Sequence, residues 1–352
     1  MRESCSLSGV GPVARHRFLI TGGAGFIGSH LAERLLASGF AVEVLDDLST
    51  GRLDNIRTLL GHSHFEFVRG SVEDAELMET LMSRCDAAFH LAATLGVELV
   101  IQQPIRAMWS IIRGVENFLN AAHHYGRPCL LTSSSEVYGK GSRIPFAEDD
   151  DVVMGATRES RWCYGYSKGI GEFLALAYHR QFALPVTVVR LFNTVGPRQV
   201  GTFGMVLPRF VEAALRGQPL WIYGDGKQSR CFCHVQDVVG AMIRLLEMPT
   251  ATAGEVYNLG NDEEVTIVEL AQRIIQLADS SSAIEFLPYE RATDRGYADV
   301  SRRVPKLDKL RAAISYQPSY NLTQIIQSVI DCTELCVKGA AYTSECALPS
   351  SG

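Results

Sequence analysis

A tyrosine and a lysine, Tyr164 and Lys168, stand four residues apart at the start of a segment with helical spacing. Residues four apart share one face of a helix, so both side chains can reach the same cleft. A cationic lysine stabilises the phenolate form of a tyrosine, which then accepts a proton from a substrate hydroxyl while hydride leaves the same carbon. Tyr138 and Tyr166 lack a lysine four residues downstream, so Tyr164 is the candidate base.

A serine-rich segment, TSSSEVYG at 132–139, ends a buried strand that precedes this pair. In open parallel sheets, ligands bind beyond the carboxyl ends of the strands, which is where the segment would lie. We therefore expect a serine hydroxyl of this segment to orient the substrate oxygen beside Tyr164. The alternative, a tyrosine and a lysine on a solvated helix face, would not require this neighbouring segment.

A glycine-rich turn, TGGAGFIG at 21–28, follows the first apolar run and opens the first helix. Gly22 permits the sharp turn, Gly25 lets the backbone approach a pyrophosphate, and Gly28 lets helix and strand pack closely. The helix N-terminus offers N–H groups and a positive dipole end to the phosphates. Asp46 follows at the end of the second strand, where it would bind ribose hydroxyls and repel a 2′-phosphate. The pattern therefore favours NAD over NADP.

Apolar runs alternate with segments of helical spacing through the first half of the chain. The pattern predicts strands at 17–21, 41–45, 65–68, 87–91 and 130–133 and helices at 26–38, 74–83 and 104–124. Such alternation implies an α/β fold with a Rossmann-type, doubly wound parallel sheet. After 186–191 the rhythm is less regular, which suits a smaller C-terminal substrate-binding lobe.

The same pattern suggests a division of the chain into segments. We expect a tail at 1–16, an NAD-binding domain at 17–192 rejoined by 236–260, a substrate-binding lobe at 193–235 and 261–337, and a tail at 338–352. The cofactor-binding residues expected in the first domain are Gly22, Gly25, Phe26, Ile27, Gly28, Asp46, Val72, Ala92 and Lys168.

Composition excludes several classes of function. The formal charge of −6 provides no basic surface for nucleic acid, and no segment reads as a signal peptide or a membrane span. The nine cysteines are irregularly spaced, which indicates reduced thiols in a cytoplasmic protein. Cys231-Phe232-Cys233-His234 lacks a second pair of ligands at zinc-finger spacing, so we interpret it as alternating strand residues and expect no metal.

Together these elements resemble the extended short-chain dehydrogenases/reductases that act on nucleotide sugars, from about residue 18 to about 336. The resemblance implies NAD as cofactor, a UDP-sugar as substrate, and a homodimer formed by the helices at 104–124 and 164–182. Within that family the chain looks most like the UDP-glucuronate decarboxylases, which include UDP-xylose synthases and the decarboxylase of the lipid A aminoarabinose pathway.

Four segments carry the narrower resemblance: SSEVY at 134–138, RWCY at 161–164, GKQSRCF at 226–232 and YADVSRRVP at 297–305. It implies catalytic roles for Ser134, Glu136, Tyr164, Lys168 and Arg303. It implies substrate-binding roles for Ser135, Arg161, Asn193, Lys227, Arg230 and Tyr297, with the tyrosine packed on uracil. Arg302 is the alternative to Arg303 for this role, and alignment of Pro305, two residues after Arg303, favours Arg303.

The chemistry explains these additions. Oxidation at C4 of UDP-glucuronate makes a β-keto acid, which loses CO2 because the electrons flow into the ketone. The enolate oxygen needs donors, which Tyr164 and Ser134 supply. Guanidinium groups bind a carboxylate bidentately, which suits Arg161 and Arg303. Glu136 would move protons around C4 and C5, and the product is the UDP-4-keto-pentose or, after hydride return, UDP-xylose.

Two other functions compete with this one. A UDP-sugar 4-epimerase or 4,6-dehydratase would use the same redox residues without the arginine pair, and a non-catalytic dinucleotide sensor would dispense with Tyr164. Two segments depart from the family pattern. Ser71 stands where an aspartate often faces adenine, and the loop at 94–103 looks more like that of an epimerase than that of a decarboxylase.

Overall fold

Seven parallel strands form the centre of the molecule, as the alternating pattern predicts. A computed structural model describes residues 16–93, 103–201, 205–288 and 302–337. The strand order is β11-β6-β5-β4-β1-β2-β3, and every pairing is parallel. The strands are β1 (Arg17–Thr21), β2 (Ala41–Asp46), β3 (Phe65–Arg69), β4 (Ala87–His90), β5 (Cys129–Ser134), β6 (Val186–Leu191) and β11 (Val256–Leu259). The order reverses between β1 and β4, so the prediction of a doubly wound sheet is confirmed.

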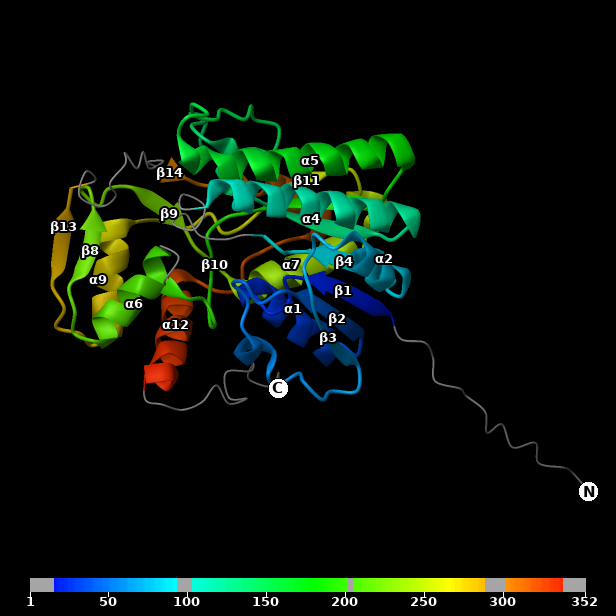
Figure 1. Cartoon of the computed structure of the whole chain (residues 1–352). Coiled ribbons are helices and arrows are strands. Elements are labelled where there is room, and N and C mark those ends of the chain that lie inside the picture. The colour runs from blue at the N-terminus through cyan, green and yellow to red at the C-terminus, as the bar shows by residue number, and fades with distance from the viewer. Residues whose placement is uncertain (1–15, 94–102, 202–204, 289–301, 338–352) are drawn as a thin grey trace, which may run out of the picture.

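Helices cover both faces of the sheet because its strands bury apolar side chains on both sides. On one face lie α1 (Phe26–Ala37), α7 (Val235–Leu246), the short α8 (Pro249–Thr252) and α11 (Asp308–Ile314). On the other lie α2 (Ala75–Ser83), α4 (Pro104–His124) and α5 (Cys163–Phe182). Within β4, Phe89 packs on the first face and Ala88 on the second. Figure 1 shows α4 and α5 side by side along the outer surface.

A smaller lobe with its own apolar core lies beyond the carboxyl ends of the central strands (Figure 1). It contains α6 (Val206–Leu215), α9 (Ile267–Leu277) and α12 (Leu322–Val337), with the parallel strands β8 (Leu220–Tyr223) and β13 (Ile284–Leu287). A second sheet has the order β12-β9-β14, from Glu264–Thr266, Ser229–Cys231 and Arg302–Arg303. The pair β7 (Thr194–Val195) and β10 (Cys233–His234) connects this lobe to the central sheet.

The cysteines near His234 lie on short strands. Cys231 ends β9 and Cys233 begins β10, and both thiols are buried. Within the ranges that the structure describes, no three His, Cys, Asp or Glu side chains come together as a metal site. No helix in the same ranges is long and apolar enough to span a bilayer.

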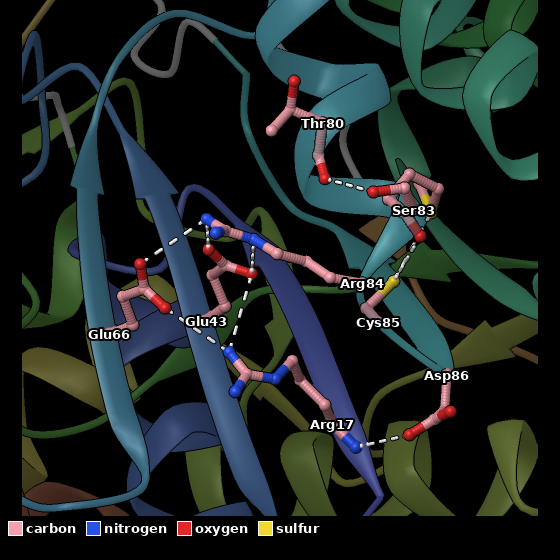
Figure 2. Close-up of polar contacts among 9 residues, drawn as sticks. Arg17, Glu43, Glu66, Thr80, Ser83, Arg84, Cys85 and Asp86 are labelled. Carbon is pink, nitrogen blue, oxygen red and sulfur yellow. Dashed lines mark hydrogen bonds and ion pairs between the residues drawn. The ribbon is translucent and has the colours of Figure 1, made fainter.

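A charge cluster lies near the amino ends of β1 and β2, remote from the edge where ligands bind. Glu43 of β2 is fully buried and is reached by Arg84 and Arg17 from two sides (Figure 2). The Arg84 Nε atom lies 3.2 Å from Glu43 Oε2, and a second nitrogen of Arg84 bonds Oε1. Glu66 of β3 accepts a hydrogen bond from Arg17, with 3.4 Å between Arg17 Nη1 and Glu66 Oε2. The cluster therefore ties the loop after α2 to the first three strands of the sheet.

Arg84→Met is expected to lower the free energy of unfolding by about 1–2 kcal/mol at neutral pH, because a buried carboxylate loses its main partner. Burial raises the pKa of Glu43 above 4.5 while Arg84 lowers it, so loss of Arg84 raises it further. A raised folded pKa means that Glu43 takes up a proton on folding, and its contribution to stability falls as pH rises through that pKa. The loss of unfolding free energy should therefore be smaller at about pH 5 than at neutral pH.

Urea denaturation of the variant at the two pH values measures this dependence. Arg57→Met is the matched control, because Arg57 pairs with Asp54 where both side chains are exposed. A loss of stability in Arg84→Met that is equal at both pH values would contradict the electrostatic explanation.

Candidate active site at the carboxyl edge of the sheet

The glycine turn between β1 and α1 has the shape that a pyrophosphate requires. Gly22 has φ +72°, and a Cβ there would lie 2.7 Å from the backbone nitrogen of Ala92. A Cβ on Gly28 would lie 2.3 Å from the carbonyl oxygen of Gly22, so helix and turn approach closely only with glycine. Gly25 caps α1 without a side chain, which leaves the first amides of the helix, from Phe26 onward, for an anion. These residues fit a dinucleotide.

Asp46 at the end of β2 lies beside this turn. Its Oδ2 atom accepts a hydrogen bond from the Ala24 amide at 3.0 Å, and its Oδ1 atom accepts one from Leu48 at 2.9 Å. The carboxylate thus braces the turn as well as occupying the position expected for a ribose-binding group. Val72, which is buried after β3, lies against Gly114 of α4.

Tyr164 and Lys168 lie on α5 over the end of β5. Gly165 allows this close approach, since a Cβ there would lie 2.8 Å from the Glu136 carbonyl oxygen. Lys168 is buried, and its Nζ atom donates to the Thr132 carbonyl at 2.9 Å and lies 6.0 Å from the centre of the Tyr164 ring. Ser134 ends β5 beside the tyrosine, and its hydroxyl lowers the pKa of the phenol. The structure thus brings all three redox residues together.

Burial dominates the ionisation of this group. It raises the pKa of Tyr164, with a smaller increase from Glu136, while the Ser134 hydroxyl lowers it. Burial also lowers the pKa of Lys168 to about 8, and the carboxylate of Glu172 acts in the opposite direction by raising it. The ammonium is therefore mostly charged at neutral pH and close enough to its pKa to respond to nearby charges.

Glu136 belongs to the short helix η2 (Ser135–Tyr138). Its side chain lies between two arginines that come from other segments. Its Oε1 atom is 2.6 Å from Arg303, and its Oε2 atom is 3.7 Å from Arg161. Burial opposes ionisation of Glu136, but Arg303 and Arg161 hold its pKa below the ordinary value. Arg302 instead points outward, where it pairs with Glu264 at 2.7 Å. Of the two neighbouring arginines, Arg303 therefore faces the site.

The remaining predicted substrate residues are divided between the site and the solvent. Ser135 is buried at the start of η2, Arg230 is buried on β9 near Glu136, and the Asn193 amide donates to the Cys231 carbonyl at 3.0 Å. Lys227 is exposed and lies 3.7 Å from Asp225, so its side chain extends into the solvent. Tyr297 and the loop at 94–102 fall outside the described residues.

Trp162 is a site residue that the sequence reasoning missed. It ends the short helix η3 (Ser160–Trp162), is 4% exposed, and lies 5.1 Å from the Arg161 guanidinium carbon. Lys140 lies 5.5 Å from the same ring. Stacking on an aromatic face restricts a guanidinium, so Trp162 orients Arg161. The adjacency of the two residues in the sequence was a usable signal.

A cavity of about 730 Å³ in the smaller lobe was also not predicted. Arg209 lines the cavity and donates hydrogen bonds to the Tyr223 hydroxyl at 3.0 Å and to the Trp221 carbonyl at 3.2 Å. Its other lining residues come from α6, β8 and β13 and include Phe210, Ala213, Pro219 and Leu287. Aromatic rings and a guanidinium stack on planar bases. A planar group could therefore stack in this cavity.

Comparison with known proteins places the chain among sugar-nucleotide enzymes. A family model described as GDP-mannose 4,6 dehydratase matches residues 19–329. A Bacillus cytotoxicus protein named UDP-N-acetyl-alpha-D-glucosaminuronate decarboxylase is 41% identical over 317 residues, 90% of this chain and 97% of the relative. UDP-glucuronic acid decarboxylase 1 of Arabidopsis thaliana is 35% identical over 310 residues, 88% and 68% of the two chains.

A solved structure shares the fold along most of the chain. It is the UDP-glucuronic acid 4-epimerase of Bacillus cereus in complex with UDP-glucuronic acid and NAD, with a TM-score of 0.81 and 28% identity. The match covers 91% of this chain and 99% of the epimerase.

Proposed function

Since the chain belongs to the GDP-mannose 4,6-dehydratase family of extended short-chain dehydrogenases/reductases, we propose that it is an NAD-dependent decarboxylase of UDP-uronic acids. UDP-glucuronate is the proposed substrate and UDP-4-keto-pentose or UDP-xylose the product. Support comes from relatives named as decarboxylases that are 35–41% identical and from the Bacillus cereus structure with NAD bound.

The arginine pair around Glu136 is the observation that carries the proposal. Arg303 and Arg161 bring two buried positive charges against one carboxylate, and Arg230 adds a third nearby. A buried excess of positive charge favours binding of an anion, and guanidinium groups suit a carboxylate. A neutral hexose provides no such group at C6, so the pair favours an acid sugar.

The proposed mechanism assigns a task to each residue. When bound at the glycine turn, NAD supplies the oxidising power by accepting hydride from C4, and it can return that hydride. Tyr164 removes the proton from the C4 hydroxyl, Ser134 orients that oxygen, and the Lys168 ammonium favours the phenolate. After the C5–C6 bond breaks and CO2 leaves, Tyr164 and Ser134 stabilise the enolate oxygen. A proton from solvent water then returns to C5, and the ionised Glu136 carboxylate is the group that would orient that water.

A second substrate is favoured by a specific observation. The Bacillus cytotoxicus relative, which is 41% identical, is named for UDP-N-acetylglucosaminuronate, whereas the Arabidopsis relative is named for UDP-glucuronate. The two uronic acids share the C6 carboxylate and differ at C2. The arginine pair accounts for the shared carboxylate and leaves the choice at C2 to direct assay.

The test is to supply purified protein and NAD with each UDP-uronic acid labelled with ¹³C at C6. Labelled CO2 is the expected product, and the faster substrate identifies the preferred C2 substituent. Retention of the label in UDP-galacturonate would instead establish a 4-epimerase and contradict the decarboxylase proposal.

We further propose that the protein is cytoplasmic, with reduced cysteines. Six cysteines among the described residues are free, and most are buried. Burial raises the pKa of the Cys85 thiol to about 12, so it reacts poorly at neutral pH. This chemistry is typical of structural cysteines in a reducing compartment.

A homodimer built on α4 and α5 is the proposed assembly. The two helices pack on each other and expose large apolar side chains, namely Ile105, Trp109, Ile170, Phe173 and Phe182. Phe173 is 72% exposed and Ile105 is 75% exposed. Exposed apolar side chains on two adjacent helices favour association, and a two-fold axis would pair the helices with those of a second copy.

Phe173→Asp is expected to convert the dimer into a monomer, because each two-fold contact would bury two unpaired carboxylates. Light scattering coupled to size exclusion measures the mass directly. Phe286→Asp is the control, since Phe286 is also exposed but lies on β13 in the smaller lobe. A Phe173→Asp protein that remains dimeric would place the interface elsewhere.

A further inference from the structure

A second buried ion pair lies directly behind the redox residues. Glu172 follows Lys168 by one turn of α5 and pairs with Arg190 of β6. Arg190 Nε lies 3.0 Å from one carboxylate oxygen, and a terminal nitrogen lies 2.8 Å from the other. The two residues are 6% and 5% exposed. Buried ion pairs contribute little net stability compared with apolar pairs of similar size, so this pair calls for a role beyond stability.

The pair contacts both segments on which the redox residues lie. The Ser133 hydroxyl donates to the Glu172 carboxylate, and Ser133 is the neighbour of Ser134 on β5. Arg190 also lies 4.7 Å from the centre of the Tyr138 ring. Because Tyr138 ends the helix η2 that carries Glu136, the guanidinium supports the segment on the opposite side of the site.

A hydrogen-bonded chain extends from there to the segment with Arg303. The Tyr138 hydroxyl donates to Asn258 Oδ1 at 2.7 Å, and the Asn258 amide donates to the Phe146 carbonyl at 2.8 Å. The Phe146 amide in turn donates to the Val304 carbonyl at 2.9 Å. Every segment with a reacting group is therefore connected to the Glu172–Arg190 pair within a few bonds.

The charges that face Lys168 come from several elements. Glu172 and Tyr164 lie on its own helix, while Arg190 approaches from β6. His90 of β4 is buried, and burial lowers its pKa to about 3, so it stays neutral. Glu136 acts from η2 on Tyr164. Glu172 favours the ammonium of Lys168, and Arg190 balances Glu172, so the pair as a whole is neutral.

We propose that the Glu172–Arg190 pair is a positioning device of the redox site, which fixes α5 against β5 and β6 and holds the electrostatic potential at Lys168 and Tyr164 in balance. The inference rests on the redox role given to Tyr164 and Lys168 under the proposed function. It assigns no direct contact with substrate to either member of the pair.

Glu172→Gln tests the charge balance while keeping the shape of the side chain. Removal of the negative charge leaves Arg190 uncompensated, which disfavours the ammonium of Lys168 and favours the phenolate of Tyr164. Both limbs of the pH profile of kcat are expected to move to lower pH by roughly 0.5–1 unit. Arg190→Gln leaves the carboxylate uncompensated and is expected to move both limbs the other way. Either variant alone carries the test if the other fails to fold.

The double variant Glu172→Gln, Arg190→Gln removes both charges, so its profile is expected to return to the parental position while kcat stays reduced. Glu255→Gln is the matched control, because Glu255 pairs with Lys309 at the surface, and its profile should equal that of the parent. Profiles that keep the parental position in both single variants would overturn the proposal, even if kcat fell at every pH.

The affinity for NADH as a function of pH provides a readout that needs no sugar substrate, because Lys168 is expected to hold the nicotinamide ribose. Its alkaline limb should shift in the same direction as the kcat profile. If the parent turns over no UDP-uronic acid and the variants still show this shift in NADH affinity, the proposed function is refuted and the positioning role stands.

Discussion

Tyr164→Phe is expected to lower kcat about 10³-fold, because the C4 hydroxyl would lose the proposed acceptor of its proton beside Ser134 and Lys168. The substitution removes one oxygen from a buried ring, so folding and the affinity for NAD should change little. Product formation from UDP-glucuronate, followed by mass spectrometry, measures the loss. Calorimetric titration with NAD measures the affinity.

Tyr166→Phe is the matched control for this prediction. Tyr166 lies on the same helix, is 37% exposed, and its hydroxyl reaches only the Gly155 carbonyl at 3.4 Å. Its loss should leave kcat within a factor of about two. Turnover of Tyr164→Phe equal to that of the parent would revive the view that the chain binds dinucleotides without catalysis.

Arg303→Met should separate oxidation from loss of CO2. Without the guanidinium, the substrate carboxylate loses a buried partner, and decarboxylation is expected to slow by about 10²-fold or more. Oxidation at C4 depends on Tyr164 and Lys168 and should continue. Reduced cofactor would then accumulate faster than CO2 appears, which parallel absorbance and ¹³CO2 measurements can follow.

Loss of Arg303 also changes the ionisation of Glu136. Burial raises the pKa of this carboxyl group, and Arg303 is the strongest influence that lowers it. The variant should therefore need a higher pH to ionise Glu136, and the acidic limb of its rate profile should move upward. Arg302→Met is the control, because Arg302 pairs with Glu264 at the surface. Equal defects in the two variants would contradict a specific role for Arg303.

Much of the fold follows from local patterns in the sequence. The helix predicted at 104–124 is observed as Pro104–His124, since a proline favours its first turn and its apolar spacing is regular. The resemblance to the extended short-chain family, and to its decarboxylases, is confirmed by the relatives. Parallel strands place their carboxyl ends at one edge, so residues that follow β1, β2 and β5 had to lie near one another.

Features that depend on distant partners were not predictable in this way. Glu172 and Arg190 look like ordinary helix and strand residues until the sheet places β6 beside β5. The choice of Arg303 over Arg302 was predicted from the resemblance alone, because a local pattern does not show which face of β14 is buried and neighbours on a strand point to opposite sides. The outward direction of Lys227 likewise depends on how its loop leaves β8, which a resemblance between sequences does not specify.

The proposed carboxylate-binding group draws on two parts of the molecule: Arg303 lies on the small sheet of the outer lobe, whereas Glu136 and Arg161 lie in η2 and η3 beside the central sheet. Loosening of the outer lobe, together with loss of the hydrogen bond from the Phe146 amide to the Val304 carbonyl, would remove Arg303 and spare the glycine turn and the tyrosine–lysine pair. Such a partly opened molecule would retain its affinity for the dinucleotide but lose its preference for acidic sugars. Discrimination among substrates is thus the more fragile property of this protein, and the capacity for hydride chemistry the more durable one.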